Sequence, residues 1–277
     1  MRQLQPRFPS LDPALDLGLT LDTVPSVRIP ALQGIIKRRF LINFRADPKV
    51  IQQILPAPFR PKLHRGYAIT GICLIRLEAI RPRWMRAPIG VSSENAAHRI
   101  AVEYYDAQNI LQEGVFISRR DTSSWVNAFV GGKLFPGEHH RARFEIQESG
   151  SQVNFAYRAL DGTAEVRFSG YDAFSLPSSS CFKNLEEASL FFQTGSLGHS
   201  IARDSQRLDG IVLETKAWQV RPFQVDQVFS SFFNDDTRFP GNSVQFDHAL
   251  IMRDISHAWH TAPELSGGAV HAAAPAV

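Results

Sequence analysis

The sequence predicts one mainly β domain, built from a large antiparallel sheet that curls into a barrel or cone. Segments with strand-like alternation recur along most of the 277 residues, and short connections of hairpin length join them. Segments with helical spacing are few and short. Phe occurs 20 times, against 5 Tyr and 4 Trp, and so many rings need a broad core. We place this domain at residues 35–256.

The N-terminal third predicts a strand, a short helix, a proline-rich corner and a second strand. In the first strand Phe40, Ile42 and Phe44 occupy alternate positions, which indicates one well-buried face. Asp47 is suited to cap a helix that starts at Pro48, since proline is favoured in the first turn. Three prolines are expected to end that helix and to force an extended corner: Pro56, Pro58 and Pro61.

The remaining elements follow in order along the chain. A long strand is expected at 67–80, where Gly71 indicates a bulge or the close approach of another backbone. Two strands at 99–106 and 114–120 form a hairpin. The later predictions are strands at 139–147, 152–160 and 165–173, a helix at 184–193, and strands at 211–222 and 244–252.

Both ends of the chain are expected to lie outside the domain. Residues 1–34 contain prolines and no sustained periodicity, and we expect an N-terminal arm. Residues 257–277 end in a stretch of Ala, Gly and Pro that buries little apolar surface, so we expect a disordered C-terminal tail. His257 and His260 have helical spacing within it, but no third ligand completes a metal set. We therefore expect no metal site.

Composition and charge exclude several classes of function. The formal net charge is +3, and the 30 basic and 27 acidic residues are interspersed, so nucleic-acid binding is not expected. The chain has no apolar run of membrane-spanning length and no signal-peptide pattern, and we expect a cytoplasmic protein. No glycine-rich phosphate loop or dinucleotide fingerprint is present, so no cofactor is expected. The two cysteines, Cys73 and Cys181, are interpreted as inert thiols.

Two segments resemble a known superfamily. The run Phe44-Arg45-Ala46-Asp47-Pro48-Lys49-Val50, with Ile54-Leu55-Pro56 and Phe59-Arg60-Pro61 after it, resembles the opening of the acetoacetate-decarboxylase-like superfamily. Within that group it is most similar to the uncharacterised YqjF-like domain family. The segment 134–144 resembles the same family's segment after a short helix, and the similarity covers most of residues 38–200. The resemblance implies a strongly bent sheet that closes around an internal cavity.

The resemblance also bears on mechanism, because true acetoacetate decarboxylases have a Schiff-base lysine in a Gly-x-Pro-Lys-Lys segment. When Ala142 is the anchor, the two family lysines fall on His139 and His140, and Lys133 is the only lysine nearby. Histidine cannot form an imine with a ketone. Classical acetoacetate decarboxylase activity is therefore not expected, and any enzymatic activity would be lyase-like or proton-transfer chemistry.

His139 and His140 are the first candidate catalytic residues. Neighbouring residues on a strand point to opposite faces, so at most one of the two faces the cavity. That histidine would serve as a general acid or base near neutral pH. The structural alternative is a hydrogen-bonded histidine at the start of a strand.

A charged cluster supplies the other candidates, and its members are Arg99, Glu103, Arg119, Arg120 and Asp121. Arg99 and Glu103 share one face of a strand, and Arg119 and Asp121 share one face of the next. The functional interpretation assigns catalysis to Glu103 and ligand binding to four further residues. These are Arg99, Arg119, Glu94 and Lys133. The alternative is a ladder of exposed ion pairs, which are far commoner than buried ones.

Two hypotheses for function follow. In the first, the protein is an enzyme that acts on a small organic acid or ketone, with an Arg binding the carboxylate and His139 or His140 moving a proton. In the second, it is a non-catalytic binding module for an apolar small metabolite. A purely structural partner protein is a third, weaker hypothesis. Each of the first two has a small-molecule ligand as the partner, and a homo-oligomer is compatible with either.

Overall fold

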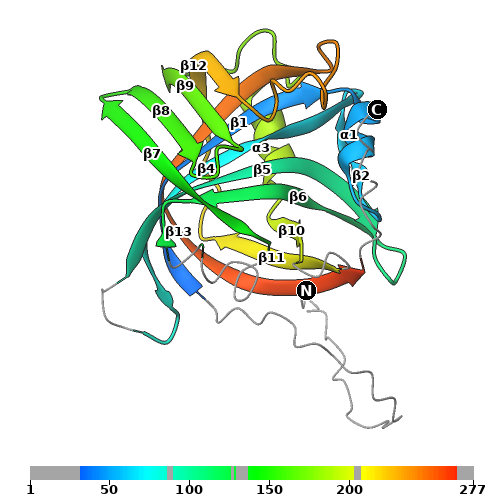
Figure 1. Cartoon of the computed structure of the whole chain (residues 1–277), viewed down its shortest axis with the longest axis horizontal. Coiled ribbons are helices and arrows are strands. Elements are labelled where there is room, and N and C mark those ends of the chain that lie inside the picture. The colour runs from blue at the N-terminus through cyan, green and yellow to red at the C-terminus, as the bar shows by residue number, and fades with distance from the viewer. Residues whose placement is uncertain (1–31, 86–89, 126–127, 129–136, 203–206, 267–277) are drawn as a thin grey trace, which may run out of the picture.

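The structure, a computed structural model, describes residues 32–85, 90–125, 128, 137–202 and 207–266. Strands dominate it, as predicted (Figure 1). They are β1 (Leu32–Ala46), β2 (Arg60–Pro61), β3 (Leu63–His64), β4 (Tyr67–Pro82), β5 (Val91–Tyr105), β6 (Leu111–Thr122), β7 (His139–Ser149), β8 (Gln152–Ala159), β9 (Glu165–Asp172), β10 (Leu197–Ile201), β11 (Arg207–Thr215), β12 (Arg221–Ser230) and β13 (Val244–Ser266). Helices α1 (Pro48–Ile54) and α3 (Leu185–Gln193) accompany them.

The hydrogen-bonded strand pairs close two rings that share a wall. The larger ring is a nine-stranded barrel that runs β6, β7, β8, β9, β12, β13, β1, β4, β5 and back to β6. The smaller ring runs β6, β10, β11, β13, β1, β4, β5 and back to β6. The shared wall is therefore β13, β1, β4, β5 and β6. The pairs β6–β7 and β6–β10 are parallel, and the other pairs are antiparallel.

The long strand β13 connects the two rings, and its extent corrects two predictions. It pairs with β12 near its start, with β1 along most of its length and with β11 towards its end (Figure 1). It therefore continues past the predicted end at residue 252 and past the predicted tail boundary at 257. His257 and His260 lie in this strand and not in a helix, because their backbone is paired with that of β1 and β11.

The single strand predicted at 211–222 is in fact two strands. β11 ends at Thr215 and belongs to the smaller ring, whereas β12 starts at Arg221 and belongs to the larger one. The sequence pattern alone does not reveal this break, because both parts alternate as strands do.

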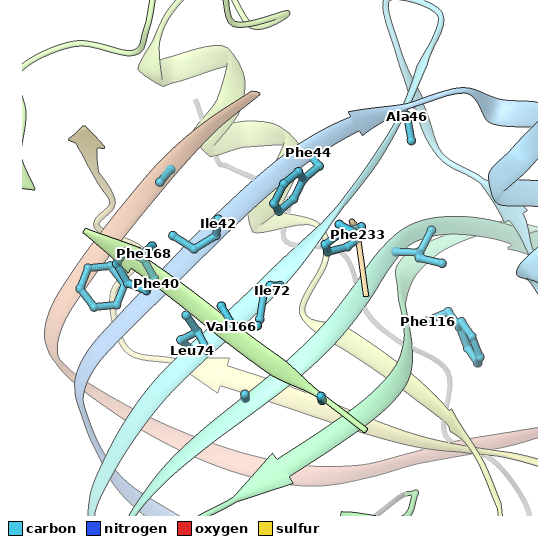
Figure 2. Close-up of a cluster of buried hydrophobic side chains, with 14 of the residues drawn as sticks. Phe40, Ile42, Phe44, Ala46, Ile72, Leu74, Phe116, Val166, Phe168 and Phe233 are labelled. Carbon is cyan, nitrogen blue, oxygen red and sulfur yellow. The ribbon is translucent and has the colours of Figure 1, made fainter. Parts of the chain in front are cut away.

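An aromatic core fills the larger ring. The Phe40 ring packs edge-on against Phe168 and Phe223, with ring centroids 5.1 and 4.9 Å apart. Figure 2 shows Phe40 and Ile42 of β1 on the same side of the wall as Phe168 of β9. The predicted alternation of Phe40, Ile42 and Phe44 is confirmed, since all three side chains are buried in this core.

The opposite face of the shared wall is buried as well. Leu41 of β1 and Cys73 of β4 belong to a second apolar cluster, which also includes Phe192 of α3. Side chains on successive positions of the wall strands therefore enter different cores. This arrangement creates an interior for the smaller ring, and the candidate site lies there.

Two local predictions in the N-terminal third are confirmed. The Asp47 carboxylate accepts a hydrogen bond from the backbone N–H of Lys49 at 2.8 Å and caps α1, which begins at Pro48. Gly71 lies where another backbone approaches closely, since a Cβ there would be 2.3 Å from the carbonyl oxygen of Ile42. The predicted N-terminal arm lies outside the described residues, apart from its last residues at the start of β1.

No helix in the described part of the chain is both long enough and apolar enough to cross a membrane.

Candidate functional site

A cavity of about 170 Å³ lies on the second face of the shared wall, inside the smaller ring. Strands β4, β5, β6, β11 and β13 all contribute to its lining. One side of it is apolar. The apolar lining residues are Ile75, Leu77, Ile80, Val91, Val115, Ile117, Ile211, Leu213 and Trp259. The polar lining residues include three arginines.

Three arginines line this cavity: Arg39, Arg99 and Arg120. The Arg39 Nε–H donates to the Cys73 Sγ at 3.1 Å, and the Arg120 Nε–H donates to the Ser200 Oγ at 3.3 Å. Within the described residues, none of the three has an ion pair with a carboxylate, whereas arginines elsewhere in the fold commonly have one. The buried Nη2 of Arg120 and the buried Nε of Arg99 also lack a hydrogen-bond partner there.

Burial weakens the charged form of two of these groups. It lowers the pKa of Arg99 and of Arg120 to about 10, and the nearby Cys73 sulfur partly opposes the effect in both. Arg39 lowers the pKa of Arg99 further, because the two like charges repel. Arg99 and Arg120 nevertheless remain cationic at neutral pH. A cluster of one buried and two half-buried cations without a counter-charge is costly, and an anion in the cavity would relieve that cost.

A buried chain of hydrogen bonds holds Arg99. Its Nη2 donates to the Oδ1 of Asn43, whose Nδ2 lies 3.0 Å from the Nε2 of His248. The Nδ1 of His248 lies 2.6 Å from the carboxylate of Asp247, which also accepts a hydrogen bond from the Ser180 hydroxyl at 2.7 Å. The Asp247 carboxylate thus fixes Nδ1 as the donor of His248. His248 in turn orients Asn43, which holds Arg99 in place.

His139 and His140 have different surroundings, as the alternation requires. His139 lines the cavity, with its Nδ1 3.3 Å from the carbonyl oxygen of Gly137. Burial, with a contribution from the Arg120 charge, lowers the pKa of His139 to about 3, so the ring is neutral at pH 7. His140 instead places its Nδ1 3.0 Å from the Asp161 carboxylate. The cavity therefore receives the first histidine of the pair.

Arg119 and Asp121 do share a face of β6, as predicted, but their charged groups point to the larger ring, away from Arg120. The Arg119 Nη2 lies 2.8 Å from the Asp121 Oδ1, and Arg119 also contacts Asp161. Burial raises the pKa of Asp121, and the Arg119 guanidinium opposes that shift. Asp121 is the only acidic residue among the described residues that line the cavity, and its carboxylate is turned away from the cavity towards Arg119 and the Tyr157 hydroxyl.

The remaining predicted residues do not join Arg99 and His139. Glu103 lies further along β5 and pairs with Arg60 at 2.8 Å. Glu94 is on the opposite face of β5, where it binds Arg38 at 2.9 Å and Arg76. Lys133 lies outside the described residues.

Sequence reasoning did not single out Arg39 or Cys73 as site residues, and it placed Arg120 in the charged cluster without assigning it a role. Arg39 is between Arg38 and Phe40, where the alternation identified only one buried face. A signal for the second face exists in β4, where Ile72-Cys73-Leu74-Ile75 is continuously apolar. Such a run is typical of a strand that is buried on both faces. No group of three or more metal-binding side chains occurs in the part of the chain that the structure describes.

The comparisons with known proteins agree with this architecture. The family model DUF2071, described as an uncharacterized conserved protein (COG2071), matches residues 36–247. No curated protein matches significantly in sequence. Acetoacetate decarboxylase from Legionella pneumophila is similar in structure, with a TM-score of 0.53 and 12% identity over 90% of this chain and 93% of that one.

Two further solved structures are similar. An acetoacetate decarboxylase-like enzyme from Sphingomonas wittichii has a TM-score of 0.53 and 13% identity, over 91% of this chain and 99% of that one. The enduracididine biosynthesis enzyme MppR, complexed with pyruvate, has a TM-score of 0.50 and 10% identity, over 85% of this chain and 89% of that one.

The fold is therefore that of the acetoacetate-decarboxylase-like proteins. The chain belongs to the DUF2071 family, whose model covers most of its length. The resemblance predicted from residues 44–61 and 134–144 is confirmed for the family and for the fold of the superfamily.

Proposed function

We propose that this protein binds a small carboxylate-bearing ketone or oxo acid in the arginine-lined cavity and moves a proton there without a Schiff-base lysine. One observation carries the proposal. Arg39, Arg99 and Arg120 converge on one cavity, and no carboxylate of the described residues pairs with them. A guanidinium group binds a carboxylate through two parallel N–H donors, which makes arginine the residue best suited to such a ligand.

The apolar side of the cavity limits the rest of the ligand. Ile75, Leu77 and Leu213 offer no hydrogen-bond partner, so a short carbon chain suits that side better than a polyol or a second acid group. The volume suits a small metabolite. The similar enzyme MppR is complexed with pyruvate, a ligand of this chemical class, which supports testing pyruvate first.

His139 is the proposed general base. Its Nδ1–H faces the Gly137 carbonyl, so the lone pair is on Nε2, and burial keeps the ring neutral at pH 7. A pKa of about 3 makes the ring a weak base, and the negative charge of a bound carboxylate would raise that pKa. A neutral imidazole can accept a proton from the carbon next to a ketone. The arginine charges would then stabilise the enolate that forms.

A lysine is not part of the proposal. Among the described lysines, Lys62 lines a recess that shares Arg39 and Arg99 with the cavity. Its Nζ lies 2.5 Å from the Glu113 carboxylate and 4.4 Å from the centre of the Phe191 ring. Both contacts engage the amine, so we assign Lys62 no role as a nucleophile.

The second candidate function is the binding of an uncharged apolar metabolite without catalysis. The apolar residues that line much of the cavity favour it. The two candidates differ in one respect that can be measured. A carboxylate ligand depends on the arginine charges, and an uncharged ligand does not.

A calorimetric titration tests the proposal. Pyruvate is compared with methyl pyruvate, an ester that lacks the charge, on the unaltered chain and on Arg120→Gln. We expect the unaltered chain to bind pyruvate and not the ester, and Arg120→Gln to lose roughly 10- to 100-fold in affinity, as for a charged hydrogen bond. The matched control is Arg158→Gln, an arginine on β8 whose side chain is 71% exposed. Equal binding of acid and ester, or an unaffected Arg120→Gln variant, would support the apolar ligand instead.

Catalysis needs a separate readout. In deuterated water, proton NMR follows the exchange of the pyruvate methyl protons. We expect the protein to accelerate this exchange and His139→Gln to abolish the acceleration while pyruvate still binds. An undiminished rate in His139→Gln would remove His139 from the proposal, and no acceleration by the unaltered chain would leave a binding protein.

A further inference from the structure

Cys73 lies in the arginine cluster of the same cavity. Its side chain is on β4, it lines the cavity, and its Sγ accepts a hydrogen bond from the Arg39 Nε–H at 3.1 Å. It is also close enough to Arg99 and Arg120 to act on both guanidinium groups electrostatically. The thiol therefore shares the cavity with three cations, and one of them contacts it directly. The sulfur of a cysteine is a nucleophile, and here it lies where an anionic reactant would bind.

The second cysteine has the opposite surroundings. Cys181 is buried to the same extent as Cys73, but its neighbour is the Asp247 carboxylate, which accepts a hydrogen bond from the Cys181 backbone N–H at 2.8 Å. Burial and this carboxylate raise the pKa of Cys181 to about 12. The chain therefore contains a matched pair of buried thiols, one among cations and one beside an anion.

The cations around Cys73 also have free binding capacity. Arg99 is only 5% exposed, and its Nε has no hydrogen-bond partner in the described part of the chain. The buried Nη2 of Arg120 likewise has no hydrogen-bond partner among the described residues. Both groups line the cavity beside the sulfur, so an anion bound there would lie next to the thiol.

We propose that Cys73 is a nucleophile of this cavity, which adds reversibly to the carbonyl carbon of a small 2-oxo carboxylate held by the arginines. This inference rests on the proposed function, because the carboxylate must bind first. The Arg39 guanidinium that contacts Sγ is also one of the carboxylate-binding groups. The reacting carbon must therefore be close to the carboxylate, which favours 2-oxo acids over longer oxo acids.

The chemical step needs no further reactant. The Sγ–C bond forms, the π bond of the carbonyl breaks, and the thiol proton moves to the carbonyl oxygen to give a thiohemiketal. The neutral His139 ring, which lines the same cavity, is able to carry that proton. The arginines stabilise the negative charge that develops on the oxygen before the proton arrives.

Two alkylating reagents that differ in charge test this inference. Iodoacetate and iodoacetamide have the same reactive carbon, next to a carboxylate in one and to a neutral amide in the other. Attack by sulfur forms the S–C bond and releases iodide and the thiol proton. For each reagent, the rate of Cys73 modification in the folded chain is divided by the rate in the urea-denatured chain. We expect this ratio to be ~10-fold higher for iodoacetate than for iodoacetamide, since a cationic cleft concentrates anions.

Peptide mass spectrometry of quenched samples gives both rates and includes an internal control. Cys181 should stay unmodified in the folded chain with either reagent. Arg120→Gln should reduce the preference of Cys73 for iodoacetate, and the surface variant Arg158→Gln should not. Excess pyruvate should slow the modification of Cys73 by both reagents. The unaltered chain alone carries the main comparison, so the test does not depend on whether a variant folds.

The outcomes separate the inference from the proposed function. Calorimetry with pyruvate on the unaltered chain tests binding independently. If pyruvate binds but Cys73 reacts no faster than Cys181, the inference is overturned and the proposed function stands. If Cys73 prefers iodoacetate, the inference is supported, whichever 2-oxo acid binds. If pyruvate does not bind and Cys73 shows no preference for iodoacetate, both are overturned.

Discussion

Three buried histidines make the fold sensitive to mild acid. His98 on β5, His199 on β10 and His257 on β13 are at most 4% exposed. Burial lowers the pKa of His98 to about 3, with help from the Arg119 and Arg238 charges. It lowers the pKa of His199 and of His257 to about 4, and in His257 Arg39 contributes while two backbone groups oppose the shift.

The sign of the pH effect follows from these values. The unfolded chain binds a proton on each histidine below about pH 6.5, whereas the folded chain does not until about pH 3 to 4. Stability is therefore complete above pH 6.5 and is lost as the pH falls towards those folded values. When the pH falls from 7.5 to 5.5, each histidine lowers the free energy of unfolding by about 1.4 kcal/mol. The three together lower the free energy of unfolding by roughly 4 kcal/mol.

Urea denaturation at pH 7.5 and 5.5, followed by circular dichroism, measures this loss. His98→Leu should reduce the loss by about 1.4 kcal/mol, because it removes one of the buried histidines that take up a proton only on unfolding. The matched control is Phe232→Leu, which alters the ring contact of His98 at 4.9 Å but leaves the imidazole in place. It should lower stability equally at both pH values. A free energy of unfolding that changes by less than about 1 kcal/mol over this range would refute the reasoning.

Further predictions concern the frame around the cavity. Asp47→Ala should lower the free energy of unfolding by about 1 kcal/mol, because α1 loses its N-cap. Gly71→Ala should cost about 2 kcal/mol or more, because its Cβ would meet the Ile42 carbonyl oxygen; a well-tolerated alanine would contradict the close approach. His248→Gln should lower the free energy of unfolding by roughly 3 kcal/mol and weaken pyruvate binding, because Arg99 loses its hydrogen-bonded support. Denaturation and calorimetry measure these two effects, and an unchanged affinity would mean that the hydrogen bonds through Asn43 and His248 do not position Arg99.

The elements that the sequence predicts well are those with local signals. The alternation in β1, the N-cap at Asp47 and the close approach at Gly71 each depend on a few neighbouring residues, and each is confirmed. The pairing of β13 with β11 and the parallel pair β6–β10 join segments that are distant in sequence. Nothing in a strand's own pattern identifies such partners, so the smaller ring was not predicted.

The candidate site was predicted in part for the same reason. Arg99 and His139 line the cavity and were candidates from the sequence. Arg39 was not a candidate, because β1 was interpreted as having one buried face, and the face that carries Arg39 is buried only once the smaller ring closes. Glu94 and Arg119 lie on the opposite face of the wall from Arg99. A shift of one position along a strand is enough to move a side chain from one face to the other.

The most direct test of a carboxylate site is a crystal structure of the protein grown with pyruvate. The account predicts the ligand in the cavity of the smaller ring, with its carboxylate oxygens about 2.7–3.1 Å from guanidinium nitrogens of Arg39, Arg99 or Arg120. A carboxylate bound elsewhere, or a cavity that holds the ligand with its carboxylate turned towards Ile75 and Leu213, would contradict it.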